Sequence, residues 1–241
     1  MNPLIMIPAR MSATRLPGKP LADIGGAPMI VRAWRQATKS GLPAVVAAGD
    51  PEIVEVIEAA GGRAVLTDPA LPSGSDRALA ALRAADPDGR HDVVVNLQGD
   101  MPFADPGLAR LCADLLAAEP QCDIATLVAP EADASDRTNV DVVKAVLAQG
   151  DDARRRALYF TRSTLYGDGT VWRHVGIYGY RRAALEQFCA APPSPLEQRE
   201  KLEQLRALEM GLQIWAAVIA EPPLSVDNPA DLEAARAFAA L

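Results

Sequence analysis

The stretch Leu4-Ile5-Met6-Ile7-Pro8-Ala9-Arg10 is a short apolar run that leads directly into polar and basic residues. A run of this length and composition predicts a buried β-strand. Further apolar runs follow, each separated from the next by a segment with helical spacing, which is the sequence form of repeated βαβ units. We predict strands at 4–7, 44–48, 63–66, 93–97 and 124–128. We predict the intervening helices at 28–39, 51–60, 76–85 and 105–118.

The pattern changes after about residue 138. Longer strand-like pieces are expected there at 142–147, 157–161, 172–180 and 213–219. Ser194 and Glu197 have the spacing of a capping box with Pro195 at the first helical position, so a helix should begin there, with Leu202, Leu205 and Leu208 on one side. A final helix is expected at 229–240. The basic run 154–156 is interpreted as a solvated turn.

These elements predict an α/β fold with a three-layer, nucleotide-binding (Rossmann-like), mainly parallel sheet flanked by helices. Residues 1–241 would form a single domain, with a small β-rich lobe around 138–212. Polar groups after the first, second and fourth strands, in 8–10, 49–50 and 98–100, should lie where open α/β sheets keep their ligand crevice.

Composition excludes several classes of function. The chain of 241 residues carries a net charge of −7 and has no basic stripe, which argues against binding to nucleic acid. Its N-terminal apolar run is far shorter than the ~20 residues of a membrane span, so we expect a cytosolic protein with no membrane partner. The three cysteines are dispersed, so we expect reduced thiols rather than disulfides. With only two histidines, the chain cannot form a Cys/His zinc site of the usual spacing. Any metal should therefore be a hard cation on oxygen ligands.

The loop at 8–20 carries the most chemistry. It reads Pro8-Ala9-Arg10-Met11-Ser12-Ala13-Thr14-Arg15-Leu16-Pro17-Gly18-Lys19-Pro20, without a Walker or dinucleotide fingerprint. Arg10, Arg15 and Lys19 place three cations on one loop of an otherwise acidic chain. Together with backbone N–H groups, such cations are suited to wrapping a triphosphate.

Several motifs carry a resemblance to a known family. Besides the loop at 8–20, they are Ser73-Gly74-Ser75-Asp76-Arg77, Asn96-Leu97-Gln98-Gly99-Asp100, the run from Arg173 to Arg181, and Ser194-Pro195-Leu196-Glu197 followed by Leu202-Glu203-Gln204-Leu205-Arg206. In this order the chain closely resembles the 3-deoxy-manno-octulosonate cytidylyltransferases, or CMP-Kdo synthetases. The resemblance implies transfer of CMP from CTP to the sugar acid Kdo for lipopolysaccharide assembly, by a homodimer whose lobe serves dimerisation and sugar binding.

The resemblance also implies roles for individual residues. Arg10 and Lys19 would hold the triphosphate and act in catalysis, together with Asp100 and Asp227 as ligands of Mg²⁺. Nucleotide-binding positions are Pro8, Ala9, Arg10, Ser12, Lys19, Ser73, Gly74, Arg77 and Gln98. Positions that would bind the sugar acid are Arg15, Arg162, His174, Tyr178, Glu203 and Gln204. Asn139 and Lys144 match a further family element.

Some of these residues have other interpretations. Asp227 or Asn228 could cap the last helix, with Pro229 in its first turn. His174 could be a satisfied, partly buried histidine, and Glu203 with Gln204 could form a solvated helix face. The chain also departs from the family pattern, most visibly at Leu71, Met101, Val140, Asp141, Tyr166 and Ser225.

Three other functions compete with this interpretation. A cytidylyltransferase for a related acid, such as 8-amino-Kdo, is the nearest. A metal-dependent glycosyltransferase would need an acidic motif, for which only Asp86-Pro87-Asp88 is available, and its Pro and the following Gly89 predict a turn. A sugar-nucleotide sensor without activity would not need both Asp100 and Asp227.

Overall fold

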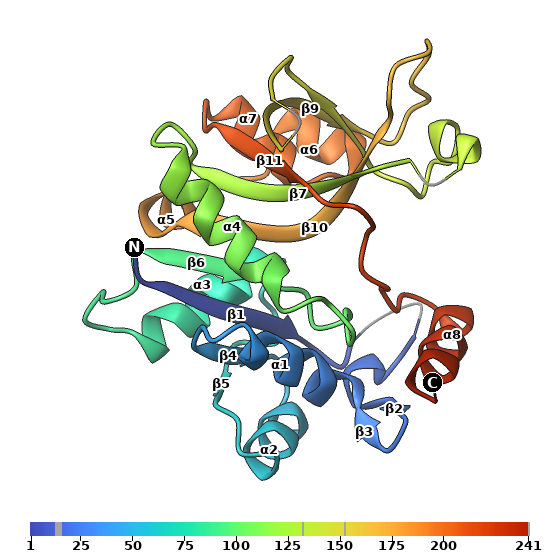
Figure 1. Ribbon diagram of the computed structural model, residues 1–241. Coiled ribbons are helices and arrows are strands. Elements are labelled where there is room, and N and C mark those ends of the chain that lie inside the picture. Colours follow the sequence, from blue (N-terminus) through green and yellow to red (C-terminus); the bar gives the residue numbers. More distant parts are fainter. Residues whose placement is uncertain (13–15, 132, 152, 241) are drawn as a thin grey trace. The chain divides into compact units, whose positions relative to one another are not determined.

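The computed structural model describes residues 1–12, 16–131, 133–151 and 153–240. The chain divides into two compact units (Figure 1). The first comprises Met1–Arg110 and Pro223–Leu241, and the second comprises Leu111–Pro222. The lobe expected at 138–212 falls within the second unit.

The strands of the first unit are parallel. They are β1 (Pro3–Ala9), β4 (Ala44–Ala48), β5 (Ala64–Leu66) and β6 (Val93–Asn96), in the order β5-β4-β1-β6. The side chains of β1, β4 and β6 are nearly all buried, as expected for parallel strands covered on both faces, whereas the edge strand β5 is partly exposed. The predicted strands in this part of the chain are confirmed.

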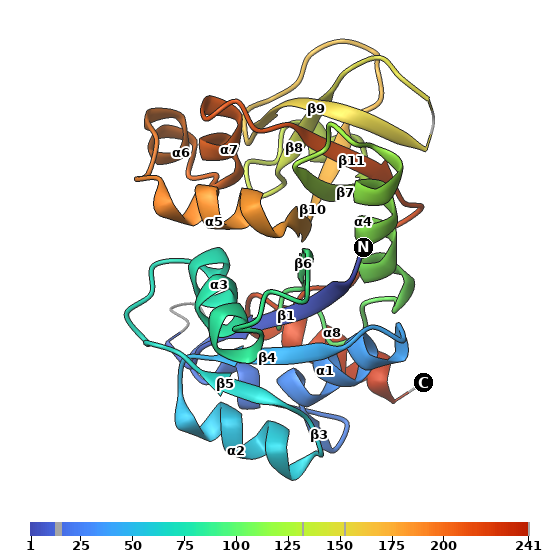
Figure 2. The same cartoon turned by 90° about the vertical axis from the view of Figure 1, so that its left-hand side faces the viewer.

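Helices cover both faces of this sheet. They are α1 (Met29–Lys39), α2 (Pro51–Ala59) and α3 (Gly74–Ala85), while α4 (Gly107–Ala118) begins in this unit and ends in the second. Right-handed crossovers place α1 and α2 on one face and α3 on the other, because the strand order reverses after β5. Figure 2 shows α1 and α3 on opposite sides of β4. The sheet of the first unit therefore has helices on both faces.

The second unit has a mixed sheet, which corrects the expectation of a mainly parallel one. Its strands are β7 (Ile124–Pro130), β8 (Lys144–Leu147), β9 (Arg154–Thr161), β10 (Trp172–Arg181) and β11 (Ile214–Val218). Among the described residues of this unit, β7 and β11 pair in parallel, whereas β10 pairs antiparallel with β7 and β8, and β9 pairs antiparallel with β8 and β11. Short connections such as the one from β8 to β9 allow only antiparallel pairing.

The basic run 154–156 is the start of a strand, so its interpretation as a solvated turn is wrong. Arg156, Arg155 and Arg154 pair with Trp215, Ala216 and Ala217 of β11. The guanidinium of Arg155 lies 5.3 Å from the ring of Trp172, and that of Arg154 lies 3.2 Å from Glu119. Three successive arginines are compatible with a strand here because Arg154 and Arg155 have partners outside the run and Arg156 is exposed to solvent.

The helix expected after Ser194 is interrupted. The predicted capping box is present, and α6 (Pro195–Glu200) begins with Pro195 in its first turn. The helix ends at Lys201, whose φ is 57°, and α7 (Gln204–Glu209) follows, after the earlier helix α5 (Arg182–Ala190). Leu202 lies between the two helices and is buried with Leu205. The expected single helix is therefore two short helices, α6 and α7, separated after Lys201.

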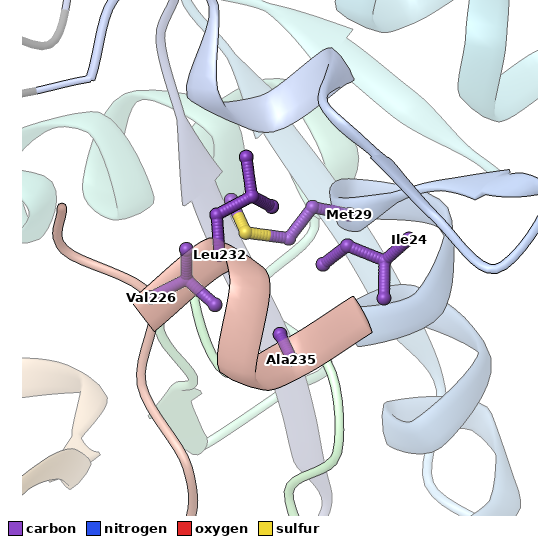
Figure 3. Packing of buried hydrophobic residues seen from close by; sticks show 5 residues of the cluster. All are labelled: Ile24, Met29, Val226, Leu232 and Ala235. Carbon is purple, nitrogen blue, oxygen red and sulfur yellow. The ribbon is translucent and has the colours of Figure 1, made fainter. Parts of the chain in front are cut away.

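Within the first unit, the C-terminal segment packs on the N-terminal part of the chain through a small apolar cluster. Val226, and Leu232 and Ala235 of α8 (Pro229–Ala239), pack with Ile24 of β2 (Asp23–Ile24) and with Met29, which follows β3 (Ala27–Pro28) (Figure 3). Val226 is fully buried, so the residue that follows it, Asp227, is held against this unit.

Two expectations from composition can be compared with the structure. Cys112 and Cys122 are buried free thiols and Cys189 is a half-buried one, in agreement with the expected reduced cysteines. Burial raises the pKa of Cys122 to about 12, so this thiol stays protonated. Within the described ranges, none of the helices has the length and apolar character needed to cross a membrane.

The cap of α8 gives a first prediction. Asn228, not Asp227, is the N-cap: its side chain accepts from the Asp231 N–H, and Asp231 accepts from the Asn228 N–H. Replacing Asn228 with Ala should lower the free energy of unfolding by about 1 kcal/mol, measured by urea unfolding. Asp227→Asn is the control and should leave it nearly unchanged. Equal losses in the two variants would contradict this assignment.

Candidate functional site

A cavity of about 340 Å³ lies in the first unit, beside the carboxyl ends of β1 and β6 and the N-terminus of α3. It is lined by Pro8, Ala9, Arg10, Ser12, Lys19, Pro20, Met29, Leu71, Pro72, Ser73, Gly74, Arg77, Gln98, Gly99, Asp100 and Asp227. Every described residue that the sequence assigned to nucleotide, catalysis or metal is among them. The assigned residue Arg15 lies outside the described residues.

The loop after β1 is shaped so that Lys19 faces this cavity. The Met11 N–H donates to Asp50 Oδ2 at 2.7 Å, and the Gly18 N–H donates to the Met11 carbonyl at 3.2 Å. Gly18 has a φ of 70°, which glycine adopts without strain, and the short 3₁₀-helix η1 (Lys19–Leu21) begins directly after it. The glycine turn therefore sets the position from which Lys19 projects.

Lys19 lies between two carboxylates. Its Nζ is 2.8 Å from Asp100 Oδ2 and 3.4 Å from Asp227 Oδ1. The two acidic residues are joined through the backbone, because the Val226 N–H donates to the Asp100 carbonyl at 2.9 Å. Burial raises the pKa of Asp100, and the Lys19 ammonium opposes that shift. The three side chains form a compact charged group at one edge of the cavity.

This charged group fits a magnesium site completed by substrate. Among the described residues, no cluster of three or more His, Cys, Asp or Glu is placed to hold a metal ion by itself. Mg²⁺ commonly takes one or two carboxylates and completes its coordination with water and substrate phosphates. Asp100 and Asp227 are close enough to share one ammonium, so they are also close enough to share a cation.

The N-terminus of α3 adds a second anion-binding feature. Ser73 caps this helix by accepting from the Asp76 N–H, and Gly74 follows at the cavity wall. Backbone N–H groups and the helix dipole favour anions at such an end.

A Cβ on Gly99 would lie 3.0 Å from the Pro8 carbonyl, so glycine is needed for β1 and the segment after β6 to meet here.

Arg77 serves the cavity mainly as scaffold. It is 2% exposed, and its guanidinium donates to Thr67 Oγ1 at 2.6 Å and to the Asp68 carbonyl at 3.1 Å. Burial lowers the pKa of Arg77. These bonds hold the chain that leads into Leu71 and Pro72, so Arg77 shapes the wall as well as contributing charge to it.

The described residues assigned to the sugar acid lie in the second unit, most of them in two groups. In one, Arg162 donates to the carbonyls of Val140 and Asp141 at 3.2 Å each. Beside it, the buried Lys144 donates to the carbonyls of Asn139 and Arg162, at 2.6 and 2.9 Å. Lys144 thus connects the two segments that carry Asn139 and Arg162.

The other group contains His174, Tyr178 and Glu203. The rings of His174 and Tyr178 have centroids 5.3 Å apart. Burial, followed by the nearby Glu203 carboxylate, raises the pKa of Tyr178. The neighbouring Gln204 is 7% exposed, so it does not belong to a solvated helix face. The structure thus brings three of the assigned residues together.

His174 is also a well-packed histidine. Its Nε2 lies 3.0 Å from Thr126 Oγ1, and the ring of Phe160 meets it edge-on at 5.0 Å. Burial lowers the pKa of His174 to about 3, so the imidazole is neutral at physiological pH. His174 thus has the packing expected of a satisfied, partly buried histidine, and it also lies beside the two other assigned side chains.

Sequence reasoning missed several residues of these sites. Pro20 and Gly99 were inside recognised motifs and could have been named. Met29 carried no signal, because an apolar residue at a helix start is ordinary core, and Thr126 is hidden in an apolar strand.

The Asp86 carboxylate accepts hydrogen bonds from the backbone N–H groups of Arg90 and His91, which confirms the predicted turn at 86–89.

Comparison with known proteins identifies relatives along nearly the whole chain. Residues 4–214 match the family model described as Cytidylyltransferase. The 3-deoxy-manno-octulosonate cytidylyltransferase of Parvibaculum lavamentivorans is 56% identical over 238 residues, which are 98% of this chain and 92% of that protein. The protein of the same name from Methylobacterium radiotolerans is 55% identical over 239 residues, covering 98% of this chain and 96% of that protein.

Two solved structures are also similar to this chain over nearly its whole length. A CMP:2-keto-3-deoxy-manno-octonic acid synthetase, solved in complex with CTP, superimposes with a TM-score of 0.90 at 35% identity and covers 100% of this chain and 99% of its own. A cytidylyltransferase from Leptospira borgpetersenii has a TM-score of 0.65 at 19% identity, with 98% and 85% covered. The latter likeness shows the fold alone.

The buried imidazole gives a prediction about pH. The folded state holds His174 neutral down to about pH 3, whereas the unfolded chain takes up a proton below about pH 6.5. Its stabilising contribution is therefore complete above about pH 6.5 and is lost as the pH falls toward 3. The unfolding free energy of the parent protein should therefore fall between pH 7.5 and pH 5.0. In His174→Gln this fall should be smaller by up to about 2 kcal/mol, measured by urea unfolding.

The second histidine supplies the control for this measurement. His91→Gln retains His174. The part of the fall in unfolding free energy that His174 causes in the parent protein should therefore remain in this variant. If His174→Gln showed the same fall as the parent, the proposed neutral state of His174 would be wrong.

Proposed function

Since the chain belongs to the cytidylyltransferase family, we propose that it transfers CMP from CTP to the anomeric hydroxyl of Kdo, giving CMP-Kdo and pyrophosphate. The observation that carries this proposal is the group formed by Lys19, Asp100 and Asp227 in a cavity at the strand ends. A site with both cationic and acidic side chains suits a triphosphate bound together with a metal ion. The names of the relatives support Kdo as the acceptor.

The first unit would bind the triphosphate of CTP. Arg10 and Lys19 supply positive charge on one side of the cavity, and the N-terminus of α3 presents backbone N–H groups on another. When the phosphates bind, they offer Lys19 a second set of anionic partners. Release from the two carboxylates would leave those carboxylates available to a metal ion.

Asp100 and Asp227 would hold Mg²⁺. When bound, the ion supplies positive charge that neutralises the triphosphate as pyrophosphate departs. Both carboxylates must be ionised for this role. Burial works against ionisation of Asp100, and the nearby ammonium of Lys19 favours it.

The transfer itself is a single in-line displacement. The C2 hydroxyl oxygen of Kdo forms a bond to the α-phosphorus of CTP as the bond from that phosphorus to the bridging oxygen breaks. The electron pair leaves with pyrophosphate, and the hydroxyl proton is lost to the surroundings. Arg10 and Lys19 stabilise the leaving group. Positioning and electrostatics are sufficient for this chemistry, so we assign no nucleophilic side chain.

The second unit would bind the sugar acid. Arg162 offers a guanidinium for the carboxylate by paired hydrogen bonds, and its position is fixed by Lys144. His174, Tyr178, Glu203 and Gln204 would contact sugar hydroxyls. We further propose that the reaction occurs in the cytoplasm and supplies activated Kdo for lipopolysaccharide assembly.

The proposal is tested by offering CTP and Mg²⁺ with a panel of ulosonic acids and following the products by ³¹P NMR. CMP-Kdo and pyrophosphate should form in equal amounts, with Kdo preferred over 8-amino-Kdo and nonulosonic acids. Binding of CTP without pyrophosphate release in the presence of Kdo would contradict the proposal and favour a sensor.

The paired carboxylates give the sharpest prediction for this mechanism. Asp100→Asn and Asp227→Asn keep the side-chain size but remove the charge that would hold a hard cation. Each should lower turnover by roughly 10²- to 10³-fold, measured at limiting Mg²⁺, with the melting temperature nearly unchanged. The exposed Asp88→Asn is the matched control and should keep full activity. A near-normal rate for Asp227→Asn would remove that residue from the metal site.

We also propose that the protein is a homodimer. The second unit exposes the large apolar side chains of Val140, Leu158 and Tyr166, at 63%, 47% and 93%. Symmetric pairing is the common way in which such surfaces are covered. Sedimentation at micromolar concentration should give a species of twice the 25.5 kDa chain mass, whereas a 25.5 kDa species would refute the proposal.

A further inference from the structure

The strand β10 contains a bulge opposite Thr126 of β7. The pairing register shifts between Val175, which pairs with Leu127, and Tyr178, which pairs with Thr126. The extra residues turn the carbonyls of Val175 and Ile177 toward the Thr126 hydroxyl, whose oxygen lies 3.2 and 3.0 Å from them. Thr126 is fully buried, so its hydroxyl must find its partners within the fold.

The same hydroxyl contacts the imidazole of His174. Thr126 Oγ1 lies 3.0 Å from His174 Nε2, so three possible partners surround one hydroxyl that has a single proton. A carbonyl oxygen can only accept. If the hydroxyl proton pointed at Nε2, the lone pairs of Oγ1 would face two carbonyl oxygens, which is unfavourable. The proton therefore points to the carbonyls, and Oγ1 accepts from an Nε2–H.

This arrangement determines the other ring nitrogen. The imidazole of His174 is neutral, because burial lowers its pKa to about 3. A neutral imidazole carries one proton, so an Nε2–H leaves Nδ1 as a pure acceptor. None of the described residues forms a hydrogen bond with His174 Nδ1, and the His174 residue is half-buried.

We propose that Thr126 is a positioning residue that fixes the Nε2–H tautomer of His174, so that Nδ1 accepts a hydrogen bond from a hydroxyl of the sugar acid. This inference rests on the proposed function, and it deepens that function by assigning the direction of one substrate hydrogen bond. Thr126 itself does not touch substrate. It acts through His174.

The fixed tautomer has a consequence for selectivity. The lone pair of Nδ1 attracts a hydroxyl proton and repels a carboxylate or carbonyl oxygen. His174 therefore faces a hydroxyl and not the carboxylate of the sugar acid. A sugar acid with no hydroxyl at this place would leave the desolvated Nδ1 without a hydrogen-bond donor, which weakens binding of that sugar acid.

The first test reads the tautomer directly in the wild-type protein. Long-range ¹H–¹⁵N correlation spectra distinguish a protonated from an unprotonated ring nitrogen, and the chain has only two histidines. His91→Gln assigns the remaining signals to His174. We expect a protonated Nε2 and an unprotonated Nδ1, and a change in the Nδ1 shift when Kdo is added. An Nδ1–H tautomer would overturn the inference without any need for a variant of Thr126.

The second test removes only the hydroxyl. Thr126→Val keeps the branched shape but leaves Nε2–H without its acceptor, whereas Thr126→Ser keeps the hydroxyl. The Val variant should show a mixture of tautomers and a KM for Kdo raised roughly fivefold to tenfold, with the KM for CTP unchanged. The Ser variant should retain the wild-type tautomer and KM.

The outcomes separate a positioning role from a structural one. A Val variant with the wild-type tautomer and an unchanged KM for Kdo would overturn the inference, as would equal rises in KM for both substrates. A wild-type protein that makes no CMP-Kdo would overturn the proposed function and with it the acceptor role of Nδ1. The wrong tautomer in an active enzyme would overturn this inference alone.

Discussion

The ammonium of Lys19, held between the carboxylates of Asp100 and Asp227, is the interaction on which the proposed chemistry depends. Its three members come from distant parts of the chain: the loop after β1, the end of β6 and the segment before α8. Two neighbouring carboxylates repel one another, and burial further disfavours the ionised form of Asp100. The lysine compensates for this repulsion in the protein without substrate, and phosphates would offer Lys19 other anionic partners once substrate binds.

The architecture of the first unit brings these members together. Parallel strands place the loop after β1 and the residues after β6 at the same edge of the sheet. The C-terminal segment is then held there by two features, the burial of Val226 against Ile24 and Met29 and its backbone bond to the Asp100 carbonyl. Asn228 begins the last helix and so leaves the Asp227 side chain to face Lys19. Packing and capping therefore determine where the second carboxylate lies.

Sequence reasoning succeeded where local rules agree with the fold. The strands and helices of the first unit were predictable from apolar runs and helical spacing, and the grouping of polar residues at the sheet edge from their place after strands. It failed where distant contacts decide. The run 154–156 became a strand through pairing with β11 and stacking on Trp172, and the helix expected after Ser194 ended early, with Lys201 in the left-handed region. Thr126 could not be recognised at all, because its role arises from a bulge in another strand.

The central claim is that Asp100 and Asp227 act on one shared cation. A double-mutant cycle on the rate of a single turnover tests it most directly, comparing Asp100→Asn, Asp227→Asn and the variant with both changes at saturating CTP and Kdo. If the carboxylates act as one unit, the double variant should be about as slow as the slower single variant, because the first change already removes the shared ion. Losses that multiply in the double variant would show that the two residues act independently and would contradict the account.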